Sequence, residues 1–171
     1  MPILFISMTK IYLMWRMLRP DAEAVLNDER AKRALSRYFA VMKNQLPARF
    51  LICARVAVKA DLSQEEESLW KAHDRGVDEL HKTLKRIDAG RLEIGDLEKP
   101  EVSLLDLKIE LAQRILRKCR FCERRCGVNR AEGKVGVCGV GAEARVASEF
   151  MHYGEEPELV PSYTIFFKGC T

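Results

Sequence analysis

Four cysteines close together in the second half of the chain are the residues best suited to chemistry. Cys119, Cys122, Cys126 and Cys138 lie within 21 residues, with the spacing C-x2-C-x3-C-x11-C. Two or three residues between cysteines let one tight turn direct successive sulfurs at a common centre, and the longer gap returns a fourth. Four thiolates are soft ligands that suit zinc or an iron–sulfur cluster. The sequence therefore predicts a four-cysteine metal site.

The identity of the metal stays open on this spacing. It is neither the two separated C-x2-C pairs of a zinc ribbon nor the run of a bacterial ferredoxin. Two disulfides are the alternative use of four cysteines, but they need an oxidising compartment, and nothing in the sequence indicates secretion. Zinc and an iron–sulfur cluster are both retained as hypotheses.

Glycine and basic residues surround the four cysteines. Glycine lets the backbone approach a metal closely, and five glycines lie here: Gly127, Gly133, Gly136, Gly139 and Gly141. Residues 117–130 contain one acidic residue, Glu123, and six basic residues. We call these six the basic collar: Arg117, Lys118, Arg120, Arg124, Arg125 and Arg130. Four thiolates around Zn²⁺ or a cluster leave net negative charge, which such a collar would offset.

Length and composition are those of an ordinary soluble protein. The 171 residues allow one domain or two small ones, and 47% apolar with 32% charged residues can bury a core. A net charge of +4 is too small to indicate a nucleic-acid partner. Phe121 is the only aromatic residue in the basic collar, whereas stacking platforms use several. We therefore expect no nucleic-acid partner.

The first 20 residues form an apolar N-terminal extension that fits no targeting segment well. Its first basic residue is Lys10, and Arg16 interrupts the apolar run again, so it suits neither a signal peptide nor a membrane span. We expect a packed helix or strand, or an extension from an early start codon with Met14 or Met17 as the true beginning. A cytoplasmic protein with no membrane partner follows from this interpretation.

Residues 21–118 are expected to form a helical region. A helix over 21–44 is ended by Pro47, and the run 50–58 is either a buried strand or part of another helix. Cys53 within that run is interpreted as a small buried hydrophobe.

Two capping boxes predict the start of two further helices. Ser63 to Glu66 begins a helix that stops at 88–90, and Ser103 to Asp106 begins one that ends near Lys118. The first of these helices has an apolar seam at Trp70, His73, Val77, Leu80, Leu84 and Ile87. The second has an apolar face of Leu104, Leu107, Leu111 and Ile115, broadened by Leu105, Ile109, Ala112 and Leu116. We interpret His73, His81 and, later in the chain, His152 as packing or surface residues rather than ligands.

Two strands are expected after Cys138. Residues 144–153 alternate apolar and polar side chains, 154–157 form a turn, and 162–168 read as a strand buried on both faces. Such a strand would have no later partner strand before Thr171, so its ladder groups would stay unpaired. We therefore expect that the polypeptide breaks off early.

The segments CRFCERRCGVNRAEGKVGVCG, HYGEEP and TIFFKGC resemble the start of a radical S-adenosylmethionine protein. More narrowly, residues 117–171 resemble the uncharacterised iron–sulfur proteins related to pyruvate formate-lyase activating enzyme. In that family a strand ending in F-x-G-C opens a partial (β/α) barrel. Its cysteine is the first of a C-x3-C-x2-C motif that holds a [4Fe–4S] cluster, and the cluster binds S-adenosylmethionine.

The resemblance implies that Cys170 is the first ligand of a [4Fe–4S] cluster. It implies reductive cleavage of S-adenosylmethionine to a 5′-deoxyadenosyl radical, with a protein substrate as one partner. It also leaves zinc or an auxiliary iron–sulfur cluster for the four upstream cysteines. The second and third ligands would fall at positions 174 and 177, beyond Thr171. One thiolate cannot hold that cluster, so we expect this chain alone to be an inactive fragment.

The expected organisation is thus an α+β fold in four parts. These are the extension 1–20, the helical region 21–118, the four-cysteine knuckle 119–143, and the start of a truncated barrel at 144–171. The fragment would come from a split or frameshifted gene, a pseudogene, or a two-chain enzyme whose other part supplies the rest of the barrel. The alternative function is a stand-alone four-cysteine metal module that binds proteins.

Overall fold

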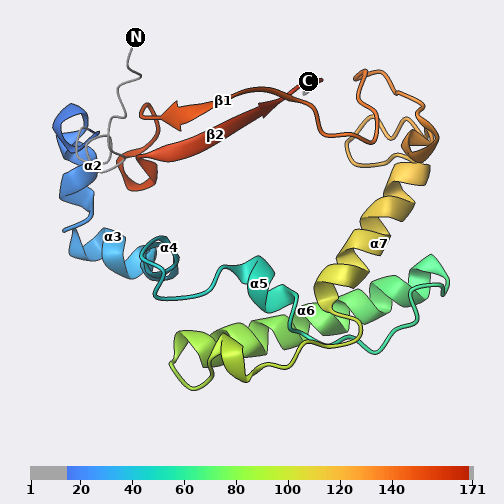
Figure 1. The fold of residues 1–171 in the computed structure, drawn as a ribbon, viewed down its shortest axis with the longest axis horizontal. Coiled ribbons are helices and arrows are strands. Elements are labelled where there is room, and N and C mark those ends of the chain that lie inside the picture. The colour runs from blue at the N-terminus through green and yellow to red at the C-terminus, as the bar shows by residue number, and fades with distance from the viewer. Residues whose placement is uncertain (1–14, 170–171) are drawn as a thin grey trace, which may run out of the picture. The chain divides into compact units, whose positions relative to one another are not determined.

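The structure, a computed structural model, describes residues 15–169 and contains helices together with one small sheet, an α+β fold (Figure 1). The chain divides into two compact units. Within the described residues, one unit contains 15–39 and 144–168, and the other contains 40–143 and Gly169. Cys170 and most of the N-terminal extension lie outside the described residues.

Three short helices replace the single helix expected over 21–44. They are α2 (Pro20–Val25), α3 (Glu29–Ala34) and α4 (Ser36–Met42). The prediction of one helix was wrong because Asp28 caps a new one: its carboxylate accepts hydrogen bonds from the amides of Arg30 and Ala31 at 2.7 and 2.9 Å.

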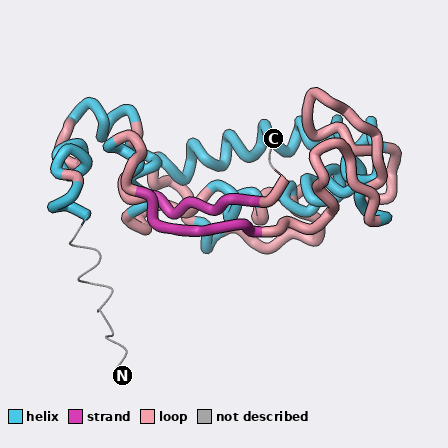
Figure 2. The backbone as a smooth tube through the Cα atoms, turned by 90° about the horizontal axis from the view of Figure 1, so that it is seen from above, coloured by secondary structure: helices cyan, strands magenta, loops and turns pink. Residues whose placement is uncertain are grey.

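A two-stranded antiparallel sheet belongs to the first unit (Figure 2). Strand β1 (Val146–His152) pairs with β2 (Ser162–Phe167), and the 3₁₀ turn η3 (Pro157–Leu159) lies in the connection. Both strands and the turn at 154–157 were expected from the sequence.

The burial of β2 on both faces was predicted wrongly. Tyr163 and Ile165 are 57% and 43% exposed, and Phe166, whose side chain points to the other face, is 51% exposed. Its apolar composition is therefore not used to bury it, because the sheet in the described residues has only β1 beside it.

A small core fixes the turn of the hairpin to the N-terminal helices. Trp15, Ala22 and Val160 are buried together. The Arg19 guanidinium pairs with the Asp21 carboxylate at 2.7 Å and donates hydrogen bonds to the backbone carbonyls of Tyr153 and Glu155. Trp15, at the end of the predicted extension, is thus packed.

The second unit is built on helix α6 (Glu66–Asp88), which packs with α5 (Arg49–Cys53) and α7 (Leu104–Arg117). Its core joins residues of all three helices: Ile52, Cys53, Val56, Leu84, Ile87 and Leu104 in one cluster, and Leu69, Ala72, Leu107 and Leu111 in another. The sequence left open whether residues 50–58 form a strand or a helix. In the structure they form a helix through Cys53, followed by an isolated β-bridge between Ala57 and Ser103. A 3₁₀ turn, η1 (Ile94–Asp96), lies in the connector before α7.

Of the two predicted capping boxes, that at Ser103 is confirmed and that at Ser63 is wrong. The Ser103 hydroxyl accepts from the Asp106 amide at 3.1 Å, and the Asp106 carboxylate accepts from the Ser103 amide at 2.9 Å. Helix α6 instead begins at Glu66, because Asp61 binds the Ser63 amide in a turn before it.

The apolar seams are confirmed only in part. On α6, Leu84 and Ile87 are buried as expected, but the N-terminal half turns Leu69 and Ala72 inward and leaves Trp70 at the surface. The broadened face of α7 was predicted too wide: its buried residues are Leu104, Leu107 and Leu111, while Ile109 is 49% exposed.

Within residues 15–169, none of the helices combines the length and the apolar character needed to cross a lipid bilayer.

Candidate metal centre

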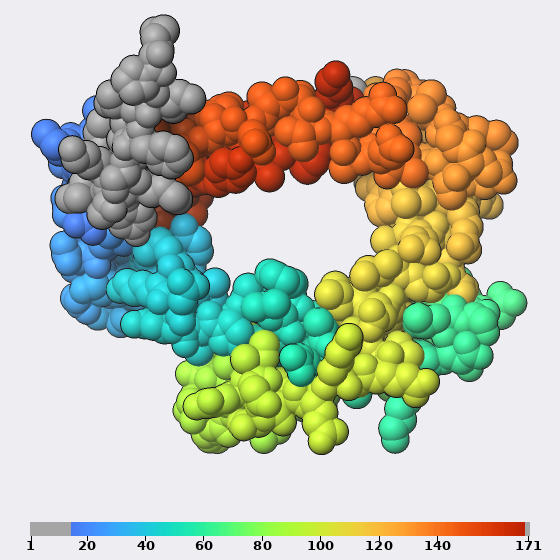
Figure 3. All heavy atoms as spheres, viewed as in Figure 1, coloured from blue at the N-terminus to red at the C-terminus, as the bar shows by residue number. Residues whose placement is uncertain are grey.

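Helix α7 carries the cysteine loop at its C-terminal end. The helix starts at the Ser103 cap and is anchored by Leu107 and Leu111 against α6. Cys119 follows the last helical residue by two positions and is only 3% exposed. In Figure 3 the orange atoms of the loop continue directly from the yellow atoms of α7. The packed helix therefore fixes where the loop begins.

Two backbone hydrogen bonds fold the loop back onto Cys119. The Cys119 amide donates to the Val128 carbonyl at 3.0 Å, and the Gly127 amide donates to the Cys119 carbonyl at 2.9 Å. Gly127 has φ +68°, which a glycine adopts at no steric cost. This pairing brings Cys126 back beside Cys119.

Cys122 lies on the outer side of the same turn. The Arg125 amide donates to the Cys122 carbonyl at 3.0 Å, and Arg125 takes a positive φ of 39° to close the turn. The Cys122 side chain is exposed, unlike that of Cys119. A tight turn is therefore present within the C-x3-C spacing, between Cys122 and Cys126, but the Cys122 thiol faces solvent.

The guanidinium of Arg130 joins the other three thiols. Arg130 opens the 3₁₀ turn η2 (Arg130–Glu132), whose cap Asn129 accepts from the Ala131 amide, and it is 5% exposed. Its Nε donates to Cys119 Sγ at 3.0 Å. Its Nη2 lies 3.3 Å from Cys138 Sγ and 3.7 Å from Cys126 Sγ. All three sulfurs thus contact the same Nε–Nη2 edge.

Gly136 makes room for this arrangement. A Cβ built on Gly136 would lie 2.7 Å from Cys126 Sγ and 3.1 Å from Arg130 Nη2. A side chain there would displace either the sulfur or the guanidinium. From the sequence, glycine was expected to let the backbone approach a metal; at Gly136 the close approach is to the Cys126 sulfur and the Arg130 guanidinium.

Charge and hydrogen bonds favour the thiolate form at two of these cysteines. Burial raises the pKa of Cys119, but hydrogen bonds from Arg130 and from the Phe121 backbone lower it, so the net pKa lies below the usual range. Hydrogen bonds from the Val140 backbone and then from Arg130 lower the pKa of Cys138. The two thiols in turn raise the pKa of Arg130. Thiolates are the form that binds metals.

The four predicted ligands are not closed into a shell. Across residues 15–169, no group of three or more histidine, cysteine, aspartate or glutamate side chains is arranged to hold a metal ion. The structure brings Cys119, Cys126 and Cys138 to one guanidinium and leaves Cys122 outside. All four thiols, together with that of Cys53, are free of disulfides.

The remaining candidates from the sequence lie in other surroundings. Cys53 is buried among the apolar side chains of the second unit, as expected. His73 Nε2 lies 2.8 Å from Lys108 Nζ, and His152 Nδ1 lies 3.0 Å from Glu155 Oε1. His81 is exposed on α6. Cys170, the predicted cluster ligand, lies outside the described residues.

The basic collar divides into surface residues and one buried residue. Arg120 pairs with Glu66 on α6, and Arg124 is exposed. The sequence placed Arg130 in the collar and did not predict that it alone would be buried. Its position could have indicated this, since Arg130 is the only arginine between Cys126 and Cys138.

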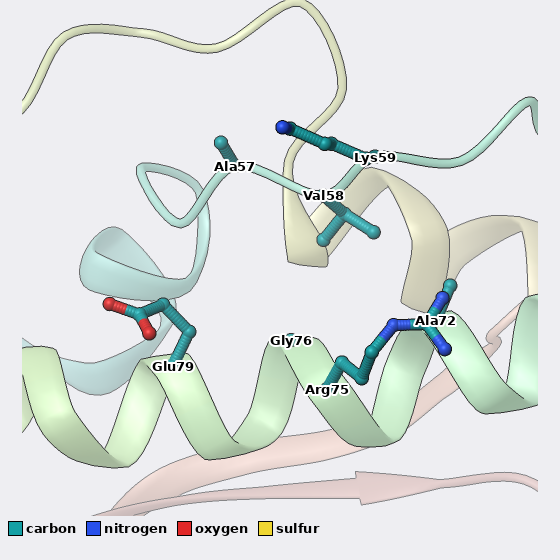
Figure 4. A pocket seen from close by; sticks show the side chains of 7 residues that line it. All are labelled: Ala57, Val58, Lys59, Ala72, Arg75, Gly76 and Glu79. Atoms are coloured by element: carbon teal, nitrogen blue, oxygen red, sulfur yellow. The ribbon is translucent and has the colours of Figure 1, made fainter.

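Hollows elsewhere on the second unit offer no comparable chemistry. One of about 280 Å³ lies along the middle of α6, between Val58 and Gly76 (Figure 4). Its charged lining residues are Lys59, Arg75 and Glu79. None of its lining residues is a cysteine or a histidine, so the cysteine loop remains the candidate site.

Comparison with known proteins finds a relative of unassigned activity. The uncharacterized protein MJ0674 of Methanocaldococcus jannaschii is 43% identical over 136 residues. The match covers 80% of this chain and 38% of that protein, so the chain spans less than two fifths of this relative's length. No established family profile matches the sequence. No solved structure matches it either.

Proposed function

We propose that this chain is the N-terminal part of a radical S-adenosylmethionine iron–sulfur enzyme, with a separate metal site at its four-cysteine loop. The observation that carries the metal-site part of the proposal is the convergence of Cys119, Cys126 and Cys138 on one edge of Arg130. The radical-enzyme part rests on the resemblance of residues 117–171. The soft donor set suits zinc or an auxiliary iron–sulfur cluster.

The chain's own residues fit such a site in charge as well as in donor type. Zn²⁺ with four thiolates carries net negative charge, and a buried guanidinium offsets part of it. Cys122 lies in the same turn as Cys126, so a change in that exposed turn would bring the fourth thiolate to the other three. These residues would bind and orient the metal.

The path of β2 supports the radical-enzyme part of the proposal. After the strand the chain reaches Gly169, where a Cβ would clash with Val140 Cγ2 and lie 3.1 Å from the Cys138 carbonyl oxygen. Gly169 also has φ +78°, a backbone conformation that favours glycine. The conformation therefore explains why a glycine occupies this position of the F-x-G-C segment. Cys170, the proposed first cluster ligand, follows it directly.

The length of MJ0674 agrees with the proposal that this chain is part of a longer protein. The match covers 38% of MJ0674, so the rest of that protein has room for the remainder of a barrel. When bound there, a [4Fe–4S] cluster with S-adenosylmethionine would supply the electron that cleaves the sulfonium and gives a 5′-deoxyadenosyl radical. A protein substrate is the partner class that the activating-enzyme resemblance implies.

Product analysis tests the radical-enzyme proposal. The 171-residue chain is compared with a version extended by the reading frame downstream of Thr171. Both are reconstituted anaerobically with iron and sulfide, reduced with dithionite and supplied with S-adenosylmethionine. We expect 5′-deoxyadenosine from the extended protein alone, and Cys170→Ala should abolish it while metal at the upstream site is kept. An extended protein that holds a cluster yet releases no 5′-deoxyadenosine would refute the assignment.

A stand-alone metal module for protein interaction is the second candidate. Apolar side chains beside the cysteines favour it, because Phe121, Val135 and Val137 are 56%, 55% and 76% exposed. Exposed apolar groups around a metal loop suit a protein contact. Both candidates require metal at the loop, and only the first requires 5′-deoxyadenosine from the extended protein.

Metal analysis of purified protein tests the part that both candidates share. We expect bound zinc or iron in the parent chain and its loss when Cys119, Cys122, Cys126 and Cys138 are all replaced by serine. Equal metal content in the two proteins would refute the site.

A further inference from the structure

Arg130 is a buried cation whose partners in the structure are sulfur atoms. Its guanidinium contacts Cys119, Cys126 and Cys138 through Nε and Nη2, while Nη1 is buried without a hydrogen-bond partner. An uncompensated buried charge is costly. The burial of this guanidinium therefore depends on the three sulfurs that it contacts.

The guanidinium of Arg130 gathers the three sulfurs at one edge. Nε and Nη2 belong to one rigid planar edge, so the sulfurs that bind them are held close to one another. Asn129 fixes the turn that presents Arg130, and Gly136 leaves the space in which the guanidinium reaches Cys126. Cys122 alone is exposed and outside this group.

We propose that Arg130 is the positioning residue of the metal site: its Nε–Nη2 edge holds Cys119, Cys126 and Cys138 together, and the exposed Cys122 completes the shell. This inference rests on the metal site of the proposed function, and it is independent of the radical chemistry. Hydrogen bonds to ligating sulfurs orient the ligands and compensate their charge, and losing such a partner costs about 10–100-fold in metal affinity.

Cobalt binding by the full 171-residue chain tests the role in metal affinity. Co²⁺ serves as an optical probe of thiolate ligation, and its dissociation constant is measured by competition with a chelator. Arg130→Gln should weaken binding by about 10–100-fold. Arg130→Lys should recover part of the loss, because it restores the charge without the planar edge. Arg124→Gln, at an exposed arginine of the same loop, should bind within about threefold of the parent.

Alkylation of the metal-free, reduced chain tests directly whether Arg130 holds the three thiols together. Iodoacetamide is added in short pulses at about pH 10, above the ordinary cysteine pKa of about 8.5, so that access to each sulfur and not its ionisation sets the rate. Each cysteine is followed by mass spectrometry. In the parent, Cys122 should react well before Cys119, Cys126 and Cys138, and Arg130→Gln should narrow that difference. Far-ultraviolet circular dichroism of each variant confirms that α6 and α7 are still folded.

The outcomes separate the two proposals. Parent-like cobalt affinity in a folded Arg130→Gln chain, or equal alkylation of all four cysteines in the folded parent, would overturn the role of Arg130. Absence of cobalt binding by the parent would overturn the metal site itself. The alkylation order would then still decide whether Arg130 gathers the three thiols.

Discussion

Gly76 of α6 lies directly against Leu104, the first residue of α7. A Cβ added to Gly76 would come within 2.8 Å of Leu104 Cδ1 and 3.2 Å of Val58 Cγ2. The absence of a side chain at Gly76 therefore allows the start of α7 to pack closely on the middle of α6.

Gly76→Ala is expected to destabilise the chain. Overpacking typically costs about 1–3 kcal/mol, whereas alanine improves helix propensity by about 1 kcal/mol, so a net loss of roughly 1 kcal/mol follows. Urea unfolding followed by circular dichroism measures it. Gly95→Ala is the matched control, because nothing lies within 4 Å of its Cβ position. A Gly76→Ala chain as stable as the parent would contradict the close packing.

The Ser103 cap should contribute more to stability than Ser63. Ser103→Ala removes the acceptor of the Asp106 amide and should cost about 1 kcal/mol of unfolding free energy. Ser63→Ala should cost less, because α6 is not capped by Ser63. Thermal unfolding of the two variants gives the comparison, and a larger loss at Ser63 would restore the sequence prediction for that helix.

The carboxylate of Asp106 should make stability depend on acid pH. Hydrogen bonds from the Ser103 hydroxyl and then its amide lower the pKa of Asp106 in the folded chain. A lowered pKa stabilises the fold above the unfolded value of about 3.9, and this contribution is lost as the pH falls through the folded pKa. The stability difference between parent and Asp106→Asn should thus be full at neutral pH and shrink below about pH 4. A difference that stayed constant into acid would contradict this.

Arg114 should be important for holding α7 to the segment before α6. Its guanidinium pairs with Glu110 at 2.7 Å and donates hydrogen bonds to the carbonyls of Leu62 and Gln64, both at 2.7 Å. Hydrogen bonds from a charged donor contribute about 1.5–3 kcal/mol, so Arg114→Gln should lower the urea midpoint clearly. Arg117→Gln, at an exposed position on the same helix, is the control and should change it little.

Cys53 should behave as a core residue and not as a ligand. Burial raises the pKa of its thiol, and its neighbours include Ile52 and Leu84. Cys53→Ala should leave the metal content unchanged. Cys53→Ser should be less stable than Cys53→Ala, since an unpaired buried hydroxyl costs about 1–3 kcal/mol. Loss of metal in a folded Cys53→Ala chain would overturn this interpretation.

Features of the fold that depend on neighbouring residues were predicted well. The Ser103 capping box, the end of α6 before Gly90 and the two strands around residues 146–167 follow from local hydrogen bonds and backbone preferences. Two of the failures, at Asp28 and Ser63, were also local in origin. Asp28 was expected inside a helix but caps a new one. Ser63 was expected to cap a helix but lies in the turn before α6. The sequence pattern allowed both conformations at each residue.

The sequence by itself determined which cysteines could act together, because ligand spacing is a property of the chain. Only the tertiary structure decided how they are arranged. Of the six basic residues in the collar, Arg130 is the one that becomes buried against the cysteines, because the loop folds back onto Cys119. The same fold leaves the Cys122 side chain exposed. The exposure of β2 was decided in the same way, since an apolar strand is buried only where another layer packs on it. Contacts between distant residues set both outcomes, and composition and periodicity carry no record of those contacts.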